Sequence, residues 1–253
     1  MGFIDTHCHL NDASYEDVAS IVEECRNQNI EKMICIGFDL PSSIRAVELA
    51  NTYDIVYAAV GIHPDEADSY NEDVEKQLEE LALNNKKVVA IGEIGLDYYW
   101  DKVSHDVQQN VFRKQIELAR RLNLPIIIHN RDAFLDTYEV LKEYAPLRGV
   151  MHCYSGSLEM AHNYMKQGLH ISFAGPVTFK NAKVPKEVAK EVPLDRILVE
   201  TDCPYLAPHP YRGKVNYPYY VNLVGKEVAS LKEISEEELM EAENRNVREL
   251  FGI

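Results

Sequence analysis

Eight short apolar or β-branched runs alternate with segments of helical period along almost the whole chain, and this alternation constrains the fold more than any other feature. Some runs are nearly continuous, such as Val88-Val89-Ala90-Ile91, which is typical of parallel strands covered on both faces. The runs predict strands over residues 3–5, 32–37, 56–62, 88–93, 125–129, 149–152, 170–173 and 196–200. We therefore expect an α/β protein with a parallel sheet.

Helical segments lie between these runs. The apolar residues Val18, Ile21, Val22 and Cys25 follow the spacing i, i+3, i+4 and i+7, which indicates an amphipathic helix. Other helices are predicted around 74–81 and over 106–122, 133–144, 158–167, 185–191 and 220–230, and a last one begins with the capping box that Ser235 opens.

A TIM-type (β/α)8 barrel is the most economical fold for these units. A chain of 253 residues has the usual length of an α/β barrel made by one domain, and no linker rich in proline, glycine or serine divides it. A doubly wound open sheet would require a glycine-rich phosphate turn after an early strand, which the sequence lacks. We predict a single barrel domain over residues 1–253.

Charge and cysteine usage narrow the class of protein. The formal net charge of −15 argues against broad electrostatic binding to nucleic acid, although divalent cations bound in a carboxylate-lined cleft can reverse the local field. The five cysteines show no CxxC spacing, so we expect free thiols in a reducing compartment. Because no secretory leader or apolar run of roughly 18 residues is seen, a cytoplasmic protein without a membrane partner is expected. The sequence does not indicate an oligomeric state.

Side chains that can bind metals or transfer protons fall at the carboxyl ends of the predicted strands. His7 and His9 lie two residues apart in an extended segment and so share a face. Later strands end at His63, Glu93, His129, His152, Glu200 and Asp202. A lone histidine after an apolar strand is more often a hydrogen-bonded core residue. In a barrel, however, these ends meet on the face that carries active sites, so the whole set indicates a metal site.

The number of candidate ligands exceeds what one tetrahedral ion needs and suits two divalent ions about 3.5 to 4 Å apart. Glu93, on a central strand, is the predicted bridge between them. His7, His9 and Asp202 are predicted on one ion. His129 and His152 are predicted on the other. Mixed imidazole and carboxylate ligation suits Zn or Mn, and Mg with more water ligands.

Six motifs, in order along the chain, resemble those of the TatD family of metal-dependent deoxyribonucleases in the amidohydrolase superfamily. They are Asp5-Thr6-His7-Cys8-His9-Leu10, Gly61-Ile62-His63-Pro64, Ile91-Gly92-Glu93-Ile94-Gly95-Leu96-Asp97, Pro125-Ile126-Ile127-Ile128-His129, His152-Cys153-Tyr154-Ser155-Gly156 and Glu200-Thr201-Asp202-Cys203-Pro204-Tyr205-Leu206-Ala207-Pro208. The resemblance implies a TIM-type barrel, one or two divalent metals, and a hydrolase usually described as a deoxyribonuclease, often 3′ to 5′ exonucleolytic. It also implies metal-ligand roles for His7, His9, Glu93, His129, His152 and Asp202. Asn130 and Cys203 stand where serine is usual, and neither position is a ligand.

Other residues are expected to act on the substrate. Asp202 is the candidate for orienting the attacking water and accepting its proton, with a plain ligand role as the alternative. His63 is expected to hydrogen-bond the phosphate or the leaving oxygen, and Glu200 to support the ligands. Three cations are candidate phosphate clamps, with ordinary solvated surface charge as the alternative: Arg131, Arg212 and Lys214.

Three classes of function fit these residues. The first, which we favour, is a phosphodiesterase whose substrate is the end of DNA or another nucleic acid. The second is a metal-dependent hydrolase of amide, ester or lactone bonds, including removal of an acyl group from an RNA end, because the fold does not determine the substrate. Many such superfamily relatives carry a carboxylated lysine where this chain has Glu93, which favours the first class. The third is a non-catalytic protein with structural zinc, which would call for a closed set of four ligands.

Overall fold

Eight parallel strands form a nearly closed barrel, as predicted, in the computed structural model, which describes residues 1–100 and 102–253. They pair in chain order. The strands are β1 (Ile4–Cys8), β2 (Lys32–Ile36), β3 (Val56–Val60), β4 (Val88–Asp97), β5 (Ile126–Arg131), β6 (Gly149–Met151), β7 (Leu169–Phe173) and β8 (Ile197–Val199). The prediction of a TIM-type (β/α)8 barrel is confirmed.

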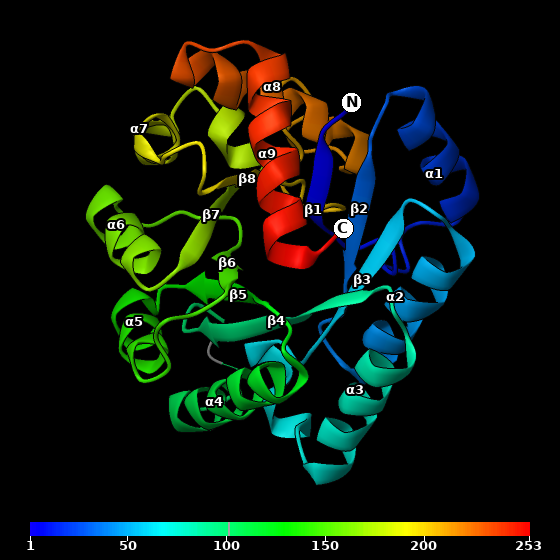
Figure 1. Cartoon of the computed structure of the whole chain (residues 1–253), viewed down its shortest axis with the longest axis vertical. Coiled ribbons are helices and arrows are strands. Elements are labelled where there is room, and N and C mark those ends of the chain that lie inside the picture. The colour runs from blue at the N-terminus through cyan, green and yellow to red at the C-terminus, as the bar shows by residue number, and fades with distance from the viewer. Residues whose placement is uncertain (101) are drawn as a thin grey trace.

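Helices follow the strands and surround them (Figure 1). They are α1 (Val18–Asn27), α2 (Leu40–Thr52), α3 (Glu72–Asn84), α4 (His105–Leu122), α5 (Phe134–Lys142), α6 (Leu158–Lys166), α7 (Lys183–Glu191), α8 (Val221–Lys232) and α9 (Glu236–Phe251). Short 3-10 turns occupy Pro64–Ser69, Gly175–Thr178 and Pro218–Tyr220. None of the helices in this described part of the chain combines the length and hydropathy that crossing a membrane requires.

Alternation along the strands produces two apolar layers. An outer layer packs against the helices, while a smaller inner cluster fills the barrel, with members such as Ile34, Ala59 and Ile127. Val247 and Phe251 of α9 belong to the inner cluster, and Figure 1 shows α9, in red, in front of the ring of strands.

Hydrogen bonds show which end of the barrel α9 covers. The Glu243 carboxylate accepts from the backbone N–H of Ile4 at 3.2 Å, and the Asn246 amide donates to the carbonyl of Ile197 at 2.8 Å. Ile4 and Ile197 are the first residues of β1 and β8. The last helix therefore covers the amino ends of the strands, and the carboxyl ends remain for the candidate site.

Helix α2 was not among the predicted helices. Its buried face includes Ser42 and Ser43 as well as apolar residues, so apolar periodicity alone does not mark it. Two local features at the start of the helix could have indicated it. The Asp39 carboxylate accepts from the Ser42 N–H at 2.7 Å, and Pro41 lies in the first turn, two features that favour a helix N-terminus.

Strand β4 continues four residues beyond the predicted end at Glu93 and brings Asp97 into the sheet. Gly95 pairs with His129 of β5 at φ +145°. A Cβ at Gly95 would overlap the His129 carbonyl, so only glycine lets the two strands approach this closely. The close approach places the side chains of both strands over one end of the barrel.

Candidate metal centre

Five of the six predicted metal ligands line a cavity of about 550 Å³ at the carboxyl ends of the strands, and the sixth, His7, is buried against Glu93. His7 is the fourth residue of β1, Glu93 lies within β4, and His129 lies within β5. The others follow the ends of strands. The cavity is lined by His9, Phe38, His63, Asp65, Glu66, Glu93, Asp97, Trp100, Lys102, His129, Arg131, His152, Asp202, Tyr205 and Leu206.

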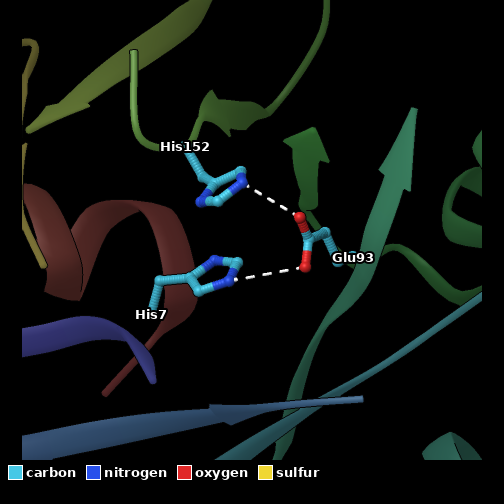
Figure 2. Close-up of side chains that lie close together, drawn as sticks. All are labelled: His7, Glu93 and His152. Carbon is cyan, nitrogen blue, oxygen red and sulfur yellow. Dashed lines mark ion pairs between the residues drawn. The ribbon is translucent and has the colours of Figure 1, made fainter. Parts of the chain in front are cut away.

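Glu93 lies between two groups of imidazoles. Its Oε1 atom is 2.8 Å from Nδ1 of His129 and 2.9 Å from Nε2 of His152. Its Oε2 atom is 3.5 Å from Nε2 of His7 and 3.8 Å from Nε2 of His9. Figure 2 shows the two carboxylate oxygens turned toward different rings, those of His7 and His152. This is the arrangement expected of a bridging carboxylate.

His7, His9 and Asp202 form one compact group. The Nε2 atoms of the two histidines are 3.3 Å apart, and Oδ1 of Asp202 lies 3.7 Å from the first and 3.6 Å from the second. These ligand atoms and those of a second group, His7, Glu93 and His152, lie close enough to hold an ion. The second group combines His7 with His152, whereas the predicted division pairs His152 with His129, whose Nδ1 atom lies 3.3 Å from Nε2 of His152.

The seam between the first and last strands positions the first group. The Asp202 N–H donates to the His7 carbonyl at 2.9 Å, and the His9 N–H donates to the Cys203 carbonyl at 2.8 Å. Cys8 and Cys203 form the isolated bridge that joins the strands here. Residues almost 200 positions apart in sequence are thus held in register by backbone hydrogen bonds, and closing the barrel assembles this part of the site.

Burial favours the neutral form of the carboxyl groups here, but the surrounding imidazole rings favour the charged form. Burial raises the pKa of Glu93, and the nearby His152 and His63 rings more than offset this, so its pKa lies well below the usual range. Burial likewise raises the pKa of Asp202, and its hydrogen bond with His9 leads the interactions that lower it overall. Both side chains are therefore carboxylates at neutral pH, as anionic metal ligands must be.

Comparison with known proteins identifies the family of this chain. The sequence matches the family described as TatD related DNase over residues 4–252. The chain belongs to the TatD family. It is 50% identical to the Bacillus subtilis (strain 168) protein named uncharacterized metal-dependent hydrolase YabD, over 98% of each chain. It is 40% identical to uncharacterized metal-dependent hydrolase YcfH of Escherichia coli (strain K12), over 100% of this chain and 97% of the other.

A solved structure gives the same assignment. The TatD homologue YJJV from Escherichia coli k12 superposes with a TM-score of 0.94 at 30% identity, covering 99% of this chain and 98% of that one. The sequence resemblance to the TatD family is confirmed, and the chain is a metal-dependent hydrolase of that family.

The hydrogen bonds of the TatD site test whether its histidines fit a metal. The second ring nitrogen of three histidines meets an oxygen acceptor: Nδ1 of His9 lies 3.2 Å from the Ile36 carbonyl, Nε2 of His129 lies 3.0 Å from Asp97, and Nδ1 of His152 lies 3.2 Å from Glu200. A histidine that binds a metal must be neutral, and a proton on each of these nitrogens would then leave the other nitrogen with its lone pair toward the site. Metal-binding histidines are held in this way, and the residues present fit divalent ions.

His63 turns a protonated nitrogen toward the cavity instead. Its Nδ1 accepts from the Asp65 backbone N–H at 3.1 Å, so the proton of the neutral ring is on Nε2, which lies 3.8 Å from Oε1 of Glu93. Burial first, and then the adjacent His129 ring, lower the pKa of His63 to about 3. His63 therefore presents a neutral N–H donor to the cavity.

The sequence interpretation gave Asp97 no role, although the residue stands in a quoted motif. Its Oδ2 atom lies 3.0 Å from Nε2 of His129, and the ligand-type atoms of His63, Asp97 and His129 lie within 4.8 Å of one another. The signal was its spacing. Asp97 follows Glu93 by four residues, which places both on one face of a strand that continues this far.

Glu200 and the predicted cations differ in whether they line the cavity of this TatD chain. Glu200 does not line the cavity but lies behind His152. Arg131 does line it, as does Lys102, which is paired with Asp65 at 3.2 Å. The Arg212 guanidinium lies 4.5 Å from the Phe179 ring centre and the Lys214 ammonium 5.8 Å from that of Tyr211, and neither residue lines the cavity.

Proposed function

We propose that this TatD protein is a two-metal deoxyribonuclease that cleaves phosphodiester bonds at the 3′ end of a DNA strand. The observation that carries the proposal is the position of Glu93, whose two oxygens face two separate groups of histidines in a cavity that also contains Arg131. Enzymes that catalyse nucleophilic displacement at phosphorus commonly use two metal ions about 3.5 to 4 Å apart.

His7, His9 and Asp202 would hold one ion and His129 and His152 the other, with Glu93 shared between them. The ions would be Zn, Mn or Mg, since all three accept imidazole or carboxylate oxygen ligands. When bound, such ions lower the pKa of water and neutralise charge on phosphoryl oxygens.

The chain's own residues then divide the remaining work. The Asp202 carboxylate orients the attacking water and accepts its proton. His63 donates its Nε2–H to a phosphoryl or leaving oxygen, since its other nitrogen is occupied by Asp65. Arg131 binds a neighbouring phosphate through its guanidinium. Asp97 and Glu200 position the rings of His129 and His152.

A strand end fits this site better than the side of a duplex. The cavity volume of about 550 Å³ lies within the range of small-ligand sites. Two cations line it, Arg131 and Lys102, so the attraction for phosphate is local in a chain whose net charge is −15. Few phosphates are therefore contacted at once.

The second candidate is hydrolysis of an ester or amide, including removal of an acyl group from an RNA end. The observation that favours it is the apolar part of the cavity lining, where Phe38 and Leu206 would contact an acyl chain. The same carboxylates and histidines would serve this reaction, since the fold does not determine the substrate.

A substrate panel distinguishes the two. Protein reconstituted with Zn, Mn or Mg is given 3′-hydroxyl single-stranded DNA, RNA, an acylated RNA and a small ester in parallel. We expect mononucleotides to be released from the DNA, and a Glu93→Gln protein purified in the same way to release none, which excludes a contaminating nuclease. Turnover of the ester or the acylated RNA with intact DNA would replace the proposal with the second candidate.

A further inference from the structure

Exposed aromatic side chains stand at the rim of the metal-centre cavity. Trp100 is 55% exposed and Tyr205 54% exposed, and both line the cavity. Tyr99 precedes Trp100 and is 54% exposed, and Leu206 follows Tyr205 and is 42% exposed. Single exposed apolar residues are normal on a protein surface, but a group of them around a polar cavity indicates a binding site.

Trp100 is held in place by the site itself. Oδ1 of Asp97 accepts from the backbone N–H groups of Tyr99 at 2.9 Å and of Trp100 at 3.1 Å. The other oxygen of the same carboxylate contacts His129. One side chain therefore contacts a candidate ligand and also anchors the backbone that carries the exposed indole.

The rings beside Trp100 restrict it further. Tyr99 packs edge-on against it with ring centres 5.0 Å apart. The Arg131 guanidinium lies 3.7 Å from the Tyr99 ring centre and 5.4 Å from that of Trp100. Within the described residues no ion pair engages Arg131, so its charge remains available at the cavity while the aromatic rings hold its position.

We propose that Trp100, with Arg131 beside it, forms a subsite for the nucleobase of an unpaired nucleotide at the strand end. The inference rests on the proposed nuclease function. A base stacks on an exposed indole whatever its sequence, while the adjacent guanidinium binds the phosphate of the same nucleotide. A base inside a duplex already has neighbours on both faces, so the subsite selects unpaired ends.

Tyr205 gives the cavity a second aromatic wall. Its hydroxyl lies 3.2 Å from the Asp12 carboxylate, and its ring stands edge-on to His9 with ring centres 6.1 Å apart. Like Trp100, Tyr205 follows a β-strand whose carboxyl end carries candidate ligands. A DNA end that enters the cavity thus meets an aromatic ring beside each of the two ligand groups.

Kinetics on matched substrates test the subsite. One oligonucleotide carries three thymidines at its 3′ end, and the other carries three abasic residues there with the same charge. We expect Trp100→Ala to raise KM for the first about 10- to 100-fold, as loss of one stacked base does, with kcat nearly unchanged. Trp100→Phe should keep most of the affinity. Leu83→Ala, which removes a 69% exposed side chain that does not line the cavity, should have no effect.

The abasic substrate decides whether the base is what Trp100 contacts. In the wild type it should lose at least as much affinity as Trp100→Ala does, and adding Trp100→Ala on the abasic substrate should cost nothing more. If the two losses multiply, the base and the indole act independently and the subsite is refuted.

A binding measurement separates this inference from the nuclease proposal. Trp100 is the single tryptophan of the chain, so tryptophan fluorescence reports on this position alone. A thymidine trinucleotide with phosphorothioate linkages, added in Mg²⁺ buffer, should quench it, and an abasic trinucleotide of the same charge should not. Quenching without DNA hydrolysis by the wild type would support the subsite and reject the nuclease. DNA hydrolysis with equal responses to the two trinucleotides would reject the subsite alone.

Discussion

Oδ2 of Asp97 lies 3.0 Å from Nε2 of His129, and this contact determines which nitrogen of the ring faces Glu93. In a neutral, metal-binding ring the Asp97 carboxylate would accept the Nε2 proton, which would leave the lone pair of Nδ1 for an ion beside Glu93, whose Oε1 lies 2.8 Å away. The same carboxylate fixes the backbone of Trp100. Asp97 therefore links a candidate metal ligand to the backbone at the cavity rim.

Asp97→Asn should weaken metal binding, because the neutral amide holds the His129 tautomer less firmly. Loss of such a supporting group typically costs 10- to 100-fold in metal affinity or activity. Calorimetric titration with Zn²⁺ measures the change. Asp65→Asn is the matched control, since Asp65 lines the same cavity but its carboxylate pairs with Lys102. Equal losses in the two variants would indicate a general effect of charge.

Asp202→Asn should lower kcat by at least about 10²-fold, the usual loss on removing a general base. The measurement is single-stranded DNA hydrolysis across a range of metal concentrations, with circular dichroism to confirm that the fold survives. If the variant reaches the wild-type rate at saturating metal, Asp202 neither accepts the proton nor acts as an essential ligand.

Arg131→Ala should raise KM for DNA, and the salt dependence of wild-type binding should be shallow. One to three contacted phosphates predict a log–log slope of about −0.7 to −2 for a single strand. Arg212→Ala serves as the comparison, because Arg212 packs over Phe179 outside the cavity lining. A steep slope, with a large effect of Arg212→Ala, would reveal an extended groove that includes the loop after β8.

Stability should fall in mild acid because of His170, which lies away from the metal centre in β7. Burial first, and then the Arg196 cation, lower the pKa of this ring to about 4. Above the unfolded pKa of about 6.5 the ring is neutral in both states and its contribution is complete. As the pH falls from about 6.5 toward 4, only the unfolded chain takes up the proton, which removes up to about 3 kcal/mol of stability.

Urea unfolding at pH 7.5 and pH 5 measures this contribution. The difference in unfolding free energy between the two pH values should be smaller in His170→Gln than in the wild type. His162→Gln, which changes an exposed histidine of α6, should leave it unchanged. An unaltered pH dependence in His170→Gln would show that this ring titrates normally in the folded protein.

The barrel and most of the site could be predicted from the sequence because both depend on local patterns. Strand and helix periods give the alternation, and parallel strands bring every carboxyl end to one face, so His7 and Asp202 could be placed together from opposite ends of the chain. Helix α2 was missed because its buried face includes serines. Asp97 was missed because the predicted strand stopped at Glu93.

The surface around the site was less predictable. Arg131 follows a strand and remains near its end, so its place at the cavity followed from the strand assignment. Arg212 and Lys214 lie in the long loop after β8, where no period determines the path of the chain. Their contacts with Phe179 and Tyr211 depend on tertiary packing, and the exposure of Trp100 depends on the turn that Asp97 holds.

Replacement of the proposed bridge provides the broadest check of the metal assignments. Glu93→Gln should reduce both metal content and activity, because a neutral amide bridges two cations poorly and the cavity loses a compensating charge. Metal analysis of purified wild type and variant, reconstituted side by side, gives the number of ions per chain. Full metal loading and normal turnover in Glu93→Gln would show that Glu93 is not a bridging ligand.

Anomalous diffraction from crystals grown with Zn²⁺ and recorded at the zinc edge tests the two-metal arrangement most directly. We expect two peaks about 3.5 to 4 Å apart, one beside His7, His9 and Asp202, the other beside His129 and His152, with one oxygen of Glu93 at each. A single peak, or two peaks that share no Glu93 carboxylate, would contradict this arrangement.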